Sequence, residues 1–268
     1  MFHIRFYVSN MEQTIGGKWI PTTMSALKDA VSILGCFSFE EPALTQADLA
    51  RRCERPKATI SRVMKTLREG GILDYDPVTR LYTPGLRLFE LGQICRSNQS
   101  FLDLVQKHLQ HVCHVGGHTG YVTVFDGQQL AVLRVVQGSS QLAISSTPGY
   151  RAWPHATSNG RAMLAILSEE EWRQRVPVEL PFVTERAPRT HEELAERIRT
   201  IRETGRSYSA NDSYDGVSSQ GIALRDPDSH EVVGVAISYP TSMATPELKA
   251  TIGDLLDHMK ADLMRRVG

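Results

Sequence analysis

Apolar residues recur with helical spacing in three stretches near the start of the chain. The first stretch, residues 24–39, carries one apolar stripe made of Leu27, Ala30, Val31, Leu34 and Phe37. The second covers residues 44–52, where Thr45 can act as the N-cap. The third opens at Pro56, and its apolar face is made of Ile60, Val63, Met64 and Leu67. These patterns predict three short helices around one small core.

The next stretch has the pattern of a β-hairpin. Gly70 and Gly71 end the third helix, and residues 72–75 and 80–82 alternate as strands around a turn at 76–79. Two short helices followed by a hairpin predict a winged helix-turn-helix. Residues 85–97 then read as a single helix that joins two domains.

Beyond residue 98 the pattern predicts an α+β domain. Its expected helices are 101–115, 162–167, 169–175, 191–204 and 245–266. Its expected strands are 121–125, 129–136, 142–145, 207–210, 220–224 and 232–238. About six antiparallel strands flanked by helices are typical of this class. We therefore expect an arm at 1–22, a winged helix-turn-helix at 23–84, a linker helix at 85–98 and a second domain at 99–268.

Charge is distributed unevenly along a chain of 268 residues whose formal net charge is zero. Residues 51–68 contain seven basic residues and one acid, Glu54. A helix with one face in a core and a short basic face outward fits the DNA major groove. A solvated basic helix pair and a winged-helix module used only for protein–protein contact are the alternatives.

Candidate DNA contacts lie on the second and third helices and on the hairpin. They are Thr45, Gln46, Arg55, Lys57, Ala58, Thr59, Ser61, Arg62, Lys65 and Arg80. The expected partner is double-stranded operator DNA, read by a two-fold dimer.

The four cysteines are far apart and form no CxxC, which favours reduced thiols in a cytoplasm over a disulfide framework. No apolar run reaches transmembrane length, so no membrane partner is expected. The expected location is the cytoplasm.

A search for catalytic chemistry finds one cluster, at His108, His111, Cys113, His114 and His118. Helical spacing lets two of these histidines face one metal, which leaves a metal-dependent enzyme as the alternative function. The chain has no phosphate loop, GxGxxG, GxSxG or HExxH. We therefore expect no enzyme and no cofactor.

The chain resembles the IclR family of bacterial transcription regulators. The matching stretches are 56–67, 70–73, 81–85, 154–165, 205–212, 215–219 and 235–240. The resemblance implies a winged helix-turn-helix joined by a helix to a GAF-like effector-binding domain. It also implies dimers, often paired into tetramers, and repression or activation of a catabolic operon in response to a small metabolite.

The resemblance also implies an effector site in the second domain. One edge is the loop at Ser158, Asn159 and Gly160, whose N–H groups are expected to open a helix at Arg161 and to suit a carboxylate. Other polar positions are Ser209, Ser219 and Ser238, and the expected apolar walls are Phe125, Trp153, Met163 and Tyr239. Many family members have Cys at the position of Ser219 and an acid at that of Ser209, so the pocket is reshaped. An aromatic acid is the expected effector.

Overall fold

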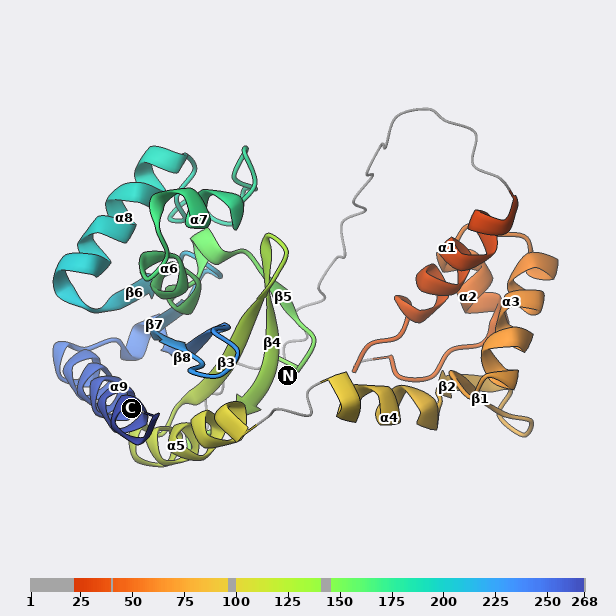
Figure 1. The fold of residues 1–268 in the computed structure, drawn as a ribbon, viewed down its shortest axis with the longest axis horizontal. Coiled ribbons are helices and arrows are strands. Elements are labelled where there is room, and N and C mark those ends of the chain that lie inside the picture. Colours follow the sequence, from red (N-terminus) through yellow and green to blue (C-terminus); the bar gives the residue numbers. More distant parts are fainter. Residues whose placement is uncertain (1–21, 40, 96–99, 141–145, 268) are drawn as a thin grey trace. The chain divides into compact units, whose positions relative to one another are not determined.

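The computed structural model describes residues 22–39, 41–95, 100–140 and 146–267. The chain divides into two units, residues 1–97 and 98–268, which are drawn in Figure 1. The expected strand at 142–145 lies outside the described residues, and so does the expected arm at 1–22 apart from Thr22. No helix in the described part of the chain has the length and the apolar run that a membrane crossing requires.

The first unit is a winged helix-turn-helix, as predicted. Its elements are α1 (Thr22–Leu34), α2 (Gln46–Arg52), α3 (Lys57–Glu69), β1 (Leu73–Asp76), β2 (Leu81–Pro84) and α4 (Leu86–Cys95). β1 and β2 form an antiparallel pair. Ile60 and Met64 of α3 are buried against Ile33 and Leu49, which confirms the apolar face expected for α3.

The buried face of α1 differs from the prediction. Leu27 and Val31 are 69% and 64% exposed, whereas Asp29 and Ile33 are buried. The Asp29 carboxylate accepts a 2.8 Å hydrogen bond from Nε of Arg55, and this partner makes its burial tolerable. The expected residues Leu34 and Phe37 do pack against the core, whereas apolar spacing misplaced Leu27 and Val31 because it gave no weight to a polar residue that faces the core.

The second unit contains one six-stranded antiparallel sheet, which confirms the expected fold class. Its strands are β3 (Thr119–Asp126), β4 (Gln129–Val136), β5 (Arg151–Ala152), β6 (Ser207–Ala210), β7 (Val217–Arg225) and β8 (Val232–Pro240). Their order across the sheet is β5-β4-β3-β8-β7-β6. The short edge strand β5 was not predicted.

Helices cover both faces of this sheet (Figure 1). They are α5 (Ser100–Gly116), α6 (Ser158–Ala165), α7 (Glu169–Gln174), α8 (His191–Thr204) and α9 (Pro246–Val267). Val233, Val235 and Ile237 of β8 point into the core beneath α5 and α9. The alternate residues of β8 face α6, and this face of the sheet carries small residues such as Gly234.

Helix α6 begins at Ser158, three residues before the expected start at Arg161 and four before the apolar pattern at 162. Thr157 is its N-cap, and the Thr157 hydroxyl accepts a 3.1 Å hydrogen bond from the N–H of Gly160. A Cβ at Gly160 would lie 2.4 Å from the carbonyl oxygen of Pro154, so this turn requires glycine. All eight residues of α6 are buried, and a helix buried on every side shows no amphipathic period.

Candidate functional site

The outward face of α3 presents polar and basic side chains. Lys57, Ser61, Arg62 and Lys65 are exposed, while Ile60 lies in the core on the opposite side. Pro56 precedes the helix as its N-cap and ends the turn after α2. The sequence therefore folds locally into a short helix whose basic side remains open to solvent.

Several basic residues near this face are neutralised by neighbours. Salt bridges join Arg51 to Asp48, Arg52 to Glu41 and Arg55 to Asp29, at distances of 2.7, 2.7 and 2.8 Å. The Arg68 guanidinium lies 5.8 Å from the centre of the Tyr75 ring. The ammonium of Lys65 is 3.8 Å from Glu69, in a pair exposed on both sides. Pairs of this kind reduce the local positive potential that the sequence predicted.

Three of the basic side chains of α3, Lys57, Arg62 and Arg68, have no acidic partner among the described residues, and Arg68 lies over the Tyr75 ring. Among the described residues, the side chains of Lys57 and Arg62 have no hydrogen-bond or ion-pair partner. Arg80 lies in the turn between β1 and β2, is exposed and has a φ of 57°. Among the described residues of the first unit, positive charge without an acidic partner therefore lies on α3 and on the hairpin turn, with Lys28 of α1 as a further exposed lysine.

Thr45 and Gln46 have structural contacts of their own. The Thr45 hydroxyl accepts from the N–H of Asp48, and this carboxylate accepts in return from the N–H of Thr45, so the two residues form a capping box. Hydrogen bonds from Thr45 are the main cause that lowers the pKa of Asp48. The Gln46 amide donates to the carbonyl oxygen of Lys57 at 3.3 Å and ties α2 to the start of α3.

The predicted polar residues of the second unit come together in a row across the sheet. Ser209 pairs with Ser219, Ser219 with Ser238, and Ser238 with Thr119, so four hydroxyl residues face α6 in register. We call these four residues the hydroxyl row. All four are buried, and the Ser209 hydroxyl has no hydrogen-bond partner within the described residues. Thr119 was missed because strand register cannot be inferred from one strand at a time.

The start of α6 contacts this row. The hydroxyl oxygens of Ser158 and Ser219 are 2.8 Å apart. Asn159 donates from Nδ2 to the Thr123 hydroxyl at 2.7 Å, and a Cβ on Gly221 would lie 2.4 Å from the Asn159 nitrogen. Glycine at 221 thus lets the helix terminus approach β7 closely, with its positive dipole end toward the hydroxyls.

A buried ion pair holds α6 in place. Arg161, the one charged residue of α6, is 2.6 Å from Asp212, and both side chains are almost fully buried. Its guanidinium also donates to the carbonyl oxygens of His155 and Tyr208. This cation is fully engaged in the scaffold, so it leaves the hydroxyl row without a charged group from α6.

The structure contradicts the expected role of Tyr239. Adjacent residues of a strand point to opposite faces, so Tyr239 and Ser238 cannot line one pocket. The Tyr239 ring is buried beneath α5 and α9, and its hydroxyl accepts from the Gln220 amide at 3.0 Å.

The expected wall Phe125 lies toward the far end of the sheet, and Trp153 lies just before the turn that leads into α6. Phe125 is six residues along β3 from Thr119, about 20 Å at a strand's rise per residue, and the Arg175 guanidinium lies over its ring. Trp153 follows β5, which pairs with β4 opposite Phe125. Met163 is fully buried, and its sulfur accepts from the Thr123 hydroxyl at 3.7 Å. The structure therefore separates Phe125, but not Trp153, from the start of α6 and the hydroxyl row.

Tyrosines near the row were missed by the sequence analysis. Tyr121 is buried and faces the same side of β3 as Thr119. The hydroxyls of Tyr150 and Tyr214 contact each other. Burial, followed by the hydroxyl of Tyr150, raises the pKa of Tyr214 well above its ordinary value. Strand alternation at 119, 121 and 123 was the signal that identifies Tyr121.

His155 is fully buried beside the start of α6. Its Nε2 donates to the Pro181 carbonyl oxygen at 3.1 Å, and its Nδ1 has no partner in the described part of the chain. Burial lowers the pKa of His155 to about 4. The ring is therefore neutral at physiological pH.

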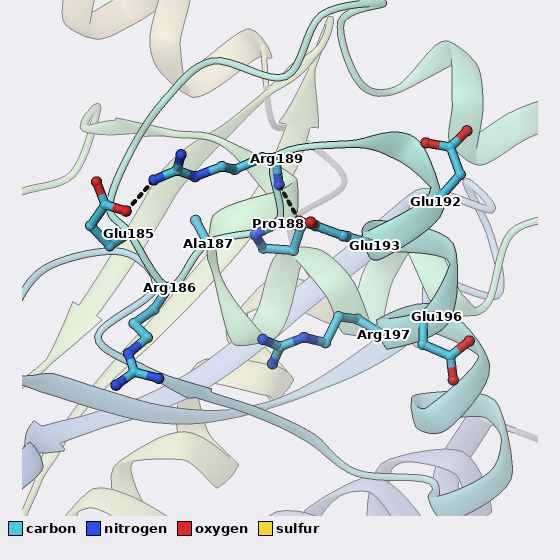
Figure 2. Close-up of a pocket in the computed structure, with 9 residues that line it drawn as sticks. All are labelled: Glu185, Arg186, Ala187, Pro188, Arg189, Glu192, Glu193, Glu196 and Arg197. Carbon is cyan, nitrogen blue, oxygen red and sulfur yellow. Dashed lines mark hydrogen bonds and ion pairs between the residues drawn. The ribbon is translucent and has the colours of Figure 1, made fainter.

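Two open hollows of the second unit lie away from the hydroxyl row. The larger, about 510 Å³, is bordered by the start of α8 and the loop before it, as Figure 2 shows. Its lining is mostly charged: Glu185, Arg186, Arg189, Glu192, Glu193, Glu196 and Arg197, with Ala187 and Pro188. Arg189 contacts Glu185 and, through its N–H, Glu193. A smaller hollow of about 180 Å³ includes Phe125.

The histidine cluster does not assemble a metal site. His111 and His114 are exposed on α5, whereas Cys113 and His118 are buried. Among the residues that the structure describes, no group of three or more histidine, cysteine or carboxylate side chains is placed to hold a metal ion. The alternative function, a metal-dependent enzyme, therefore lacks the metal site that it requires in the described part of the chain.

Family models match both units. The IclR helix-turn-helix domain matches residues 26–77, and the C-terminal domain of the bacterial transcriptional regulator IclR matches residues 95–262. The chain belongs to the IclR family. It is accordingly a bacterial transcriptional regulator with a DNA-binding helix-turn-helix and an effector-binding domain, and it is not an enzyme.

Individual IclR regulators are distant in sequence and close in fold. The chain is 22% identical to the regulator XynR of Escherichia coli over 91% of its own length and 98% of that protein. The Thermotoga maritima IclR structure has a TM-score of 0.74 at 23% identity, covering 91% of this chain and 99% of that one. An IclR homolog of Microbacterium hydrocarbonoxydans, complexed with 4-hydroxybenzoate, has a TM-score of 0.75 at 19% identity, covering 90% and 99%.

Proposed function

We propose that this regulator controls a catabolic operon and that a small aromatic acid, bound in the second unit, modulates its binding to operator DNA. The observation that carries the proposal is the meeting of the hydroxyl row with the start of α6. The catabolic assignment rests on the family resemblance. Binding of the acid would favour one state of the paired DNA-binding domains over another.

For the DNA contact, the outward face of α3 is the natural candidate. Lys57 and Arg62 are exposed basic residues without acidic partners in the described chain, and Ser61 lies between them. Arg80 in the hairpin turn adds a charge suited to the phosphate backbone. Arg55 remains a predicted contact, although its salt bridge with Asp29 already gives it a structural role. Thr45, Gln46, Ala58, Thr59 and Lys65 complete the proposed interface.

A homodimer, or a tetramer made of two dimers, is the proposed assembly. Leu27 and Val31 of α1 and Leu86, Phe89 and Ile94 of α4 are each more than 60% exposed. Large apolar side chains gathered on two helices are typical of a surface that associates. A two-fold dimer would present two α3 helices to a palindromic operator.

For the effector, the candidate groups are the N–H groups of Ser158 and Asn159 and the hydroxyls of the hydroxyl row. The start of a helix favours a carboxylate, and neutral hydroxyls can hydrogen-bond it without a cation. Tyr121 offers an aromatic wall on the same face, in place of Tyr239. A relative of the same fold binds 4-hydroxybenzoate, an acid of the proposed class. The remaining proposed site residues border the acid less directly, from α6 and from the rest of the sheet. They are Phe125, Trp153, Gly160 and Met163.

Titration calorimetry tests the effector class. Benzoate-type acids and short keto acids are titrated side by side into wild type and into Ser219→Leu. We expect only the aromatic acids to bind wild type, and Ser219→Leu to weaken them at least about tenfold because leucine fills the space beside Ser158 and removes a hydroxyl. Ser242→Leu, at an exposed position, is the matched control and should bind as wild type does.

Two results would contradict this proposal. Binding of the short acids alone would exclude the aromatic class. Equal affinities for wild type and Ser219→Leu would remove the hydroxyl row from the site.

A further inference from the structure

Two cysteines that are distant in sequence lie side by side in the first unit. The sulfur atoms of Cys36 and Cys53 are 3.7 Å apart, and both cysteines are free thiols. Cys36 follows the end of α1, and Cys53 is the C-cap residue of α2. This pair could not be predicted from the sequence, because 17 positions separate the two cysteines.

The pair lies in a partly open place. Both side chains are half-buried, so a small molecule in solvent can reach them. The Cys36 thiol donates to the carbonyl oxygen of Ser32, and the Cys36 carbonyl oxygen accepts from Arg52. Burial, with a further contribution from Cys36, raises the pKa of the Cys53 thiol to about 12. Cys53 is thus a poor first target for an oxidant.

We propose that Cys36 and Cys53 form a reversible disulfide that regulates DNA binding. A disulfide needs a sulfur separation of about 2.05 Å, so the two sulfurs must approach by roughly 1.6 Å. Side-chain rotation and a small shift of the α2 C-cap supply this movement. The proposal concerns the first unit alone and does not depend on the effector.

The chemistry balances with a peroxide as the oxidant. Cys36 gives its thiol electrons to the peroxide, forms a sulfenic acid and releases one water when hydrogen peroxide is used. The sulfur of Cys53 then attacks the sulfenic sulfur, a second water leaves with the thiol proton, and the S–S bond forms. Two electrons pass from the two thiols to the peroxide. A dithiol reductant reverses the reaction by thiol–disulfide exchange.

The new bond would act on α3, the proposed DNA-binding helix, through the turn that precedes it. Cys53 is followed by Glu54, whose φ is 51°, by Arg55, which is bonded to Asp29 of α1, and by Pro56, the N-cap of α3. Drawing Cys53 toward α1 moves this short connection. The first residues of α3, including Lys57, shift with it, and DNA affinity falls.

Peptide mapping and DNA binding of the full chain test the proposal. Wild type is treated with hydrogen peroxide and digested without reduction. We expect a cross-linked pair of peptides that contain Cys36 and Cys53, with a mass two hydrogens lower than their sum. For DNA binding, the probe is a duplex selected by the reduced protein from a random library. Oxidation should weaken binding about tenfold, within the usual range of couplings between sites, and a dithiol should restore it.

The single variants Cys36→Ser and Cys53→Ser are matched controls, since each removes one sulfur with little change of volume. Both should bind the probe as reduced wild type does and should lose the response to peroxide. Circular dichroism before and after treatment checks that each variant is folded, and either variant alone suffices as the control. An absent 36–53 cross-link, with oxidation elsewhere, overturns the proposal. A cross-link that leaves the affinity within twofold of the reduced protein overturns its regulatory part.

Discussion

At the scale of single residues, the buried charges are the least predictable part of this regulator. Asp29 and Arg161 are buried because each has an ionic partner far along the chain, Arg55 and Asp212 respectively. A sequence shows the charge and not its partner, so the burial of Asp29 was not predicted. Periodicity could not reveal these pairs, whereas it did identify the apolar contacts of Ile60 and Met64.

His155 gives a prediction at this scale. Its pKa is lowered from 6.5 to about 4, mainly by burial, with repulsion from Arg161 and His191 as smaller contributions. A lowered histidine pKa means that the unfolded chain binds the proton more tightly than the folded one. The stabilisation is therefore fully present above about pH 6.5 and is lost as the pH falls toward 4, by about 3 kcal/mol.

Urea unfolding from pH 7 to pH 4, followed by circular dichroism, measures this loss. In His155→Gln the amide can donate to the Pro181 carbonyl oxygen but does not titrate, so we expect a clearly shallower acid dependence than in wild type. His111→Gln, at an exposed position of α5, should keep the wild-type dependence. Parallel curves for wild type and His155→Gln would refute the assignment.

At the scale of elements, the clearly amphipathic segments were predicted well. The bounds expected for α8 and β4 agree with the structure, and α3 has the expected core face. Helix α6 was placed late because its first residues are small, polar and wholly buried, which gives no helical period. The error over Tyr239 had another cause: it was chosen as an apolar wall beside Ser238, although strand alternation directs the two side chains to opposite faces.

The contact between α6 and β7 gives the second prediction. A methyl group at Gly221 would lie 2.4 Å from the backbone nitrogen of Asn159. This clash can be relieved only if one of the two backbones moves. We expect Gly221→Ala to lower the free energy of unfolding by about 1–3 kcal/mol. The variant should also weaken effector binding, since the start of α6 is displaced from the hydroxyl row.

Gly92→Ala is the matched control in thermal and urea unfolding. Gly92 lies in α4 with open space around its Cα, so alanine should be neutral or should stabilise the helix by about 0.5–1 kcal/mol. If Gly221→Ala is as stable as wild type, the close approach of α6 to β7 is wrong.

At the scale of the whole molecule, the change of pattern near residue 98 predicted where a second domain begins, and the structure divides into two units at 97–98. Assembly cannot be derived from the fold of one chain, but the exposed residues of α1 and α4 direct a test. We expect wild type to be at least a dimer by light scattering at micromolar concentration. The double variant Leu27→Glu/Phe89→Glu should shift it toward monomer, because it places charges in an apolar interface.

Val178→Glu provides the control, since Val178 is 91% exposed outside both helices. This variant should keep the wild-type mass. A wild-type monomer, or a double variant with unchanged mass, would show that α1 and α4 do not form the interface.

The central claim is that the outward face of α3 binds DNA, and the salt dependence of DNA affinity measures this most directly. Fluorescence anisotropy is recorded at several salt concentrations for wild type, Arg62→Ala and Arg51→Ala, on one duplex selected by wild type. Arg62 is free of acids in the described chain, whereas Arg51 is paired with Asp48. We predict that Arg62→Ala weakens binding about tenfold and, through a lost phosphate contact, lowers the salt slope by about one, while Arg51→Ala stays within twofold of wild type. The claim would be contradicted by an Arg62→Ala variant with wild-type affinity and slope, or by a wild type that shows no saturable binding to any duplex.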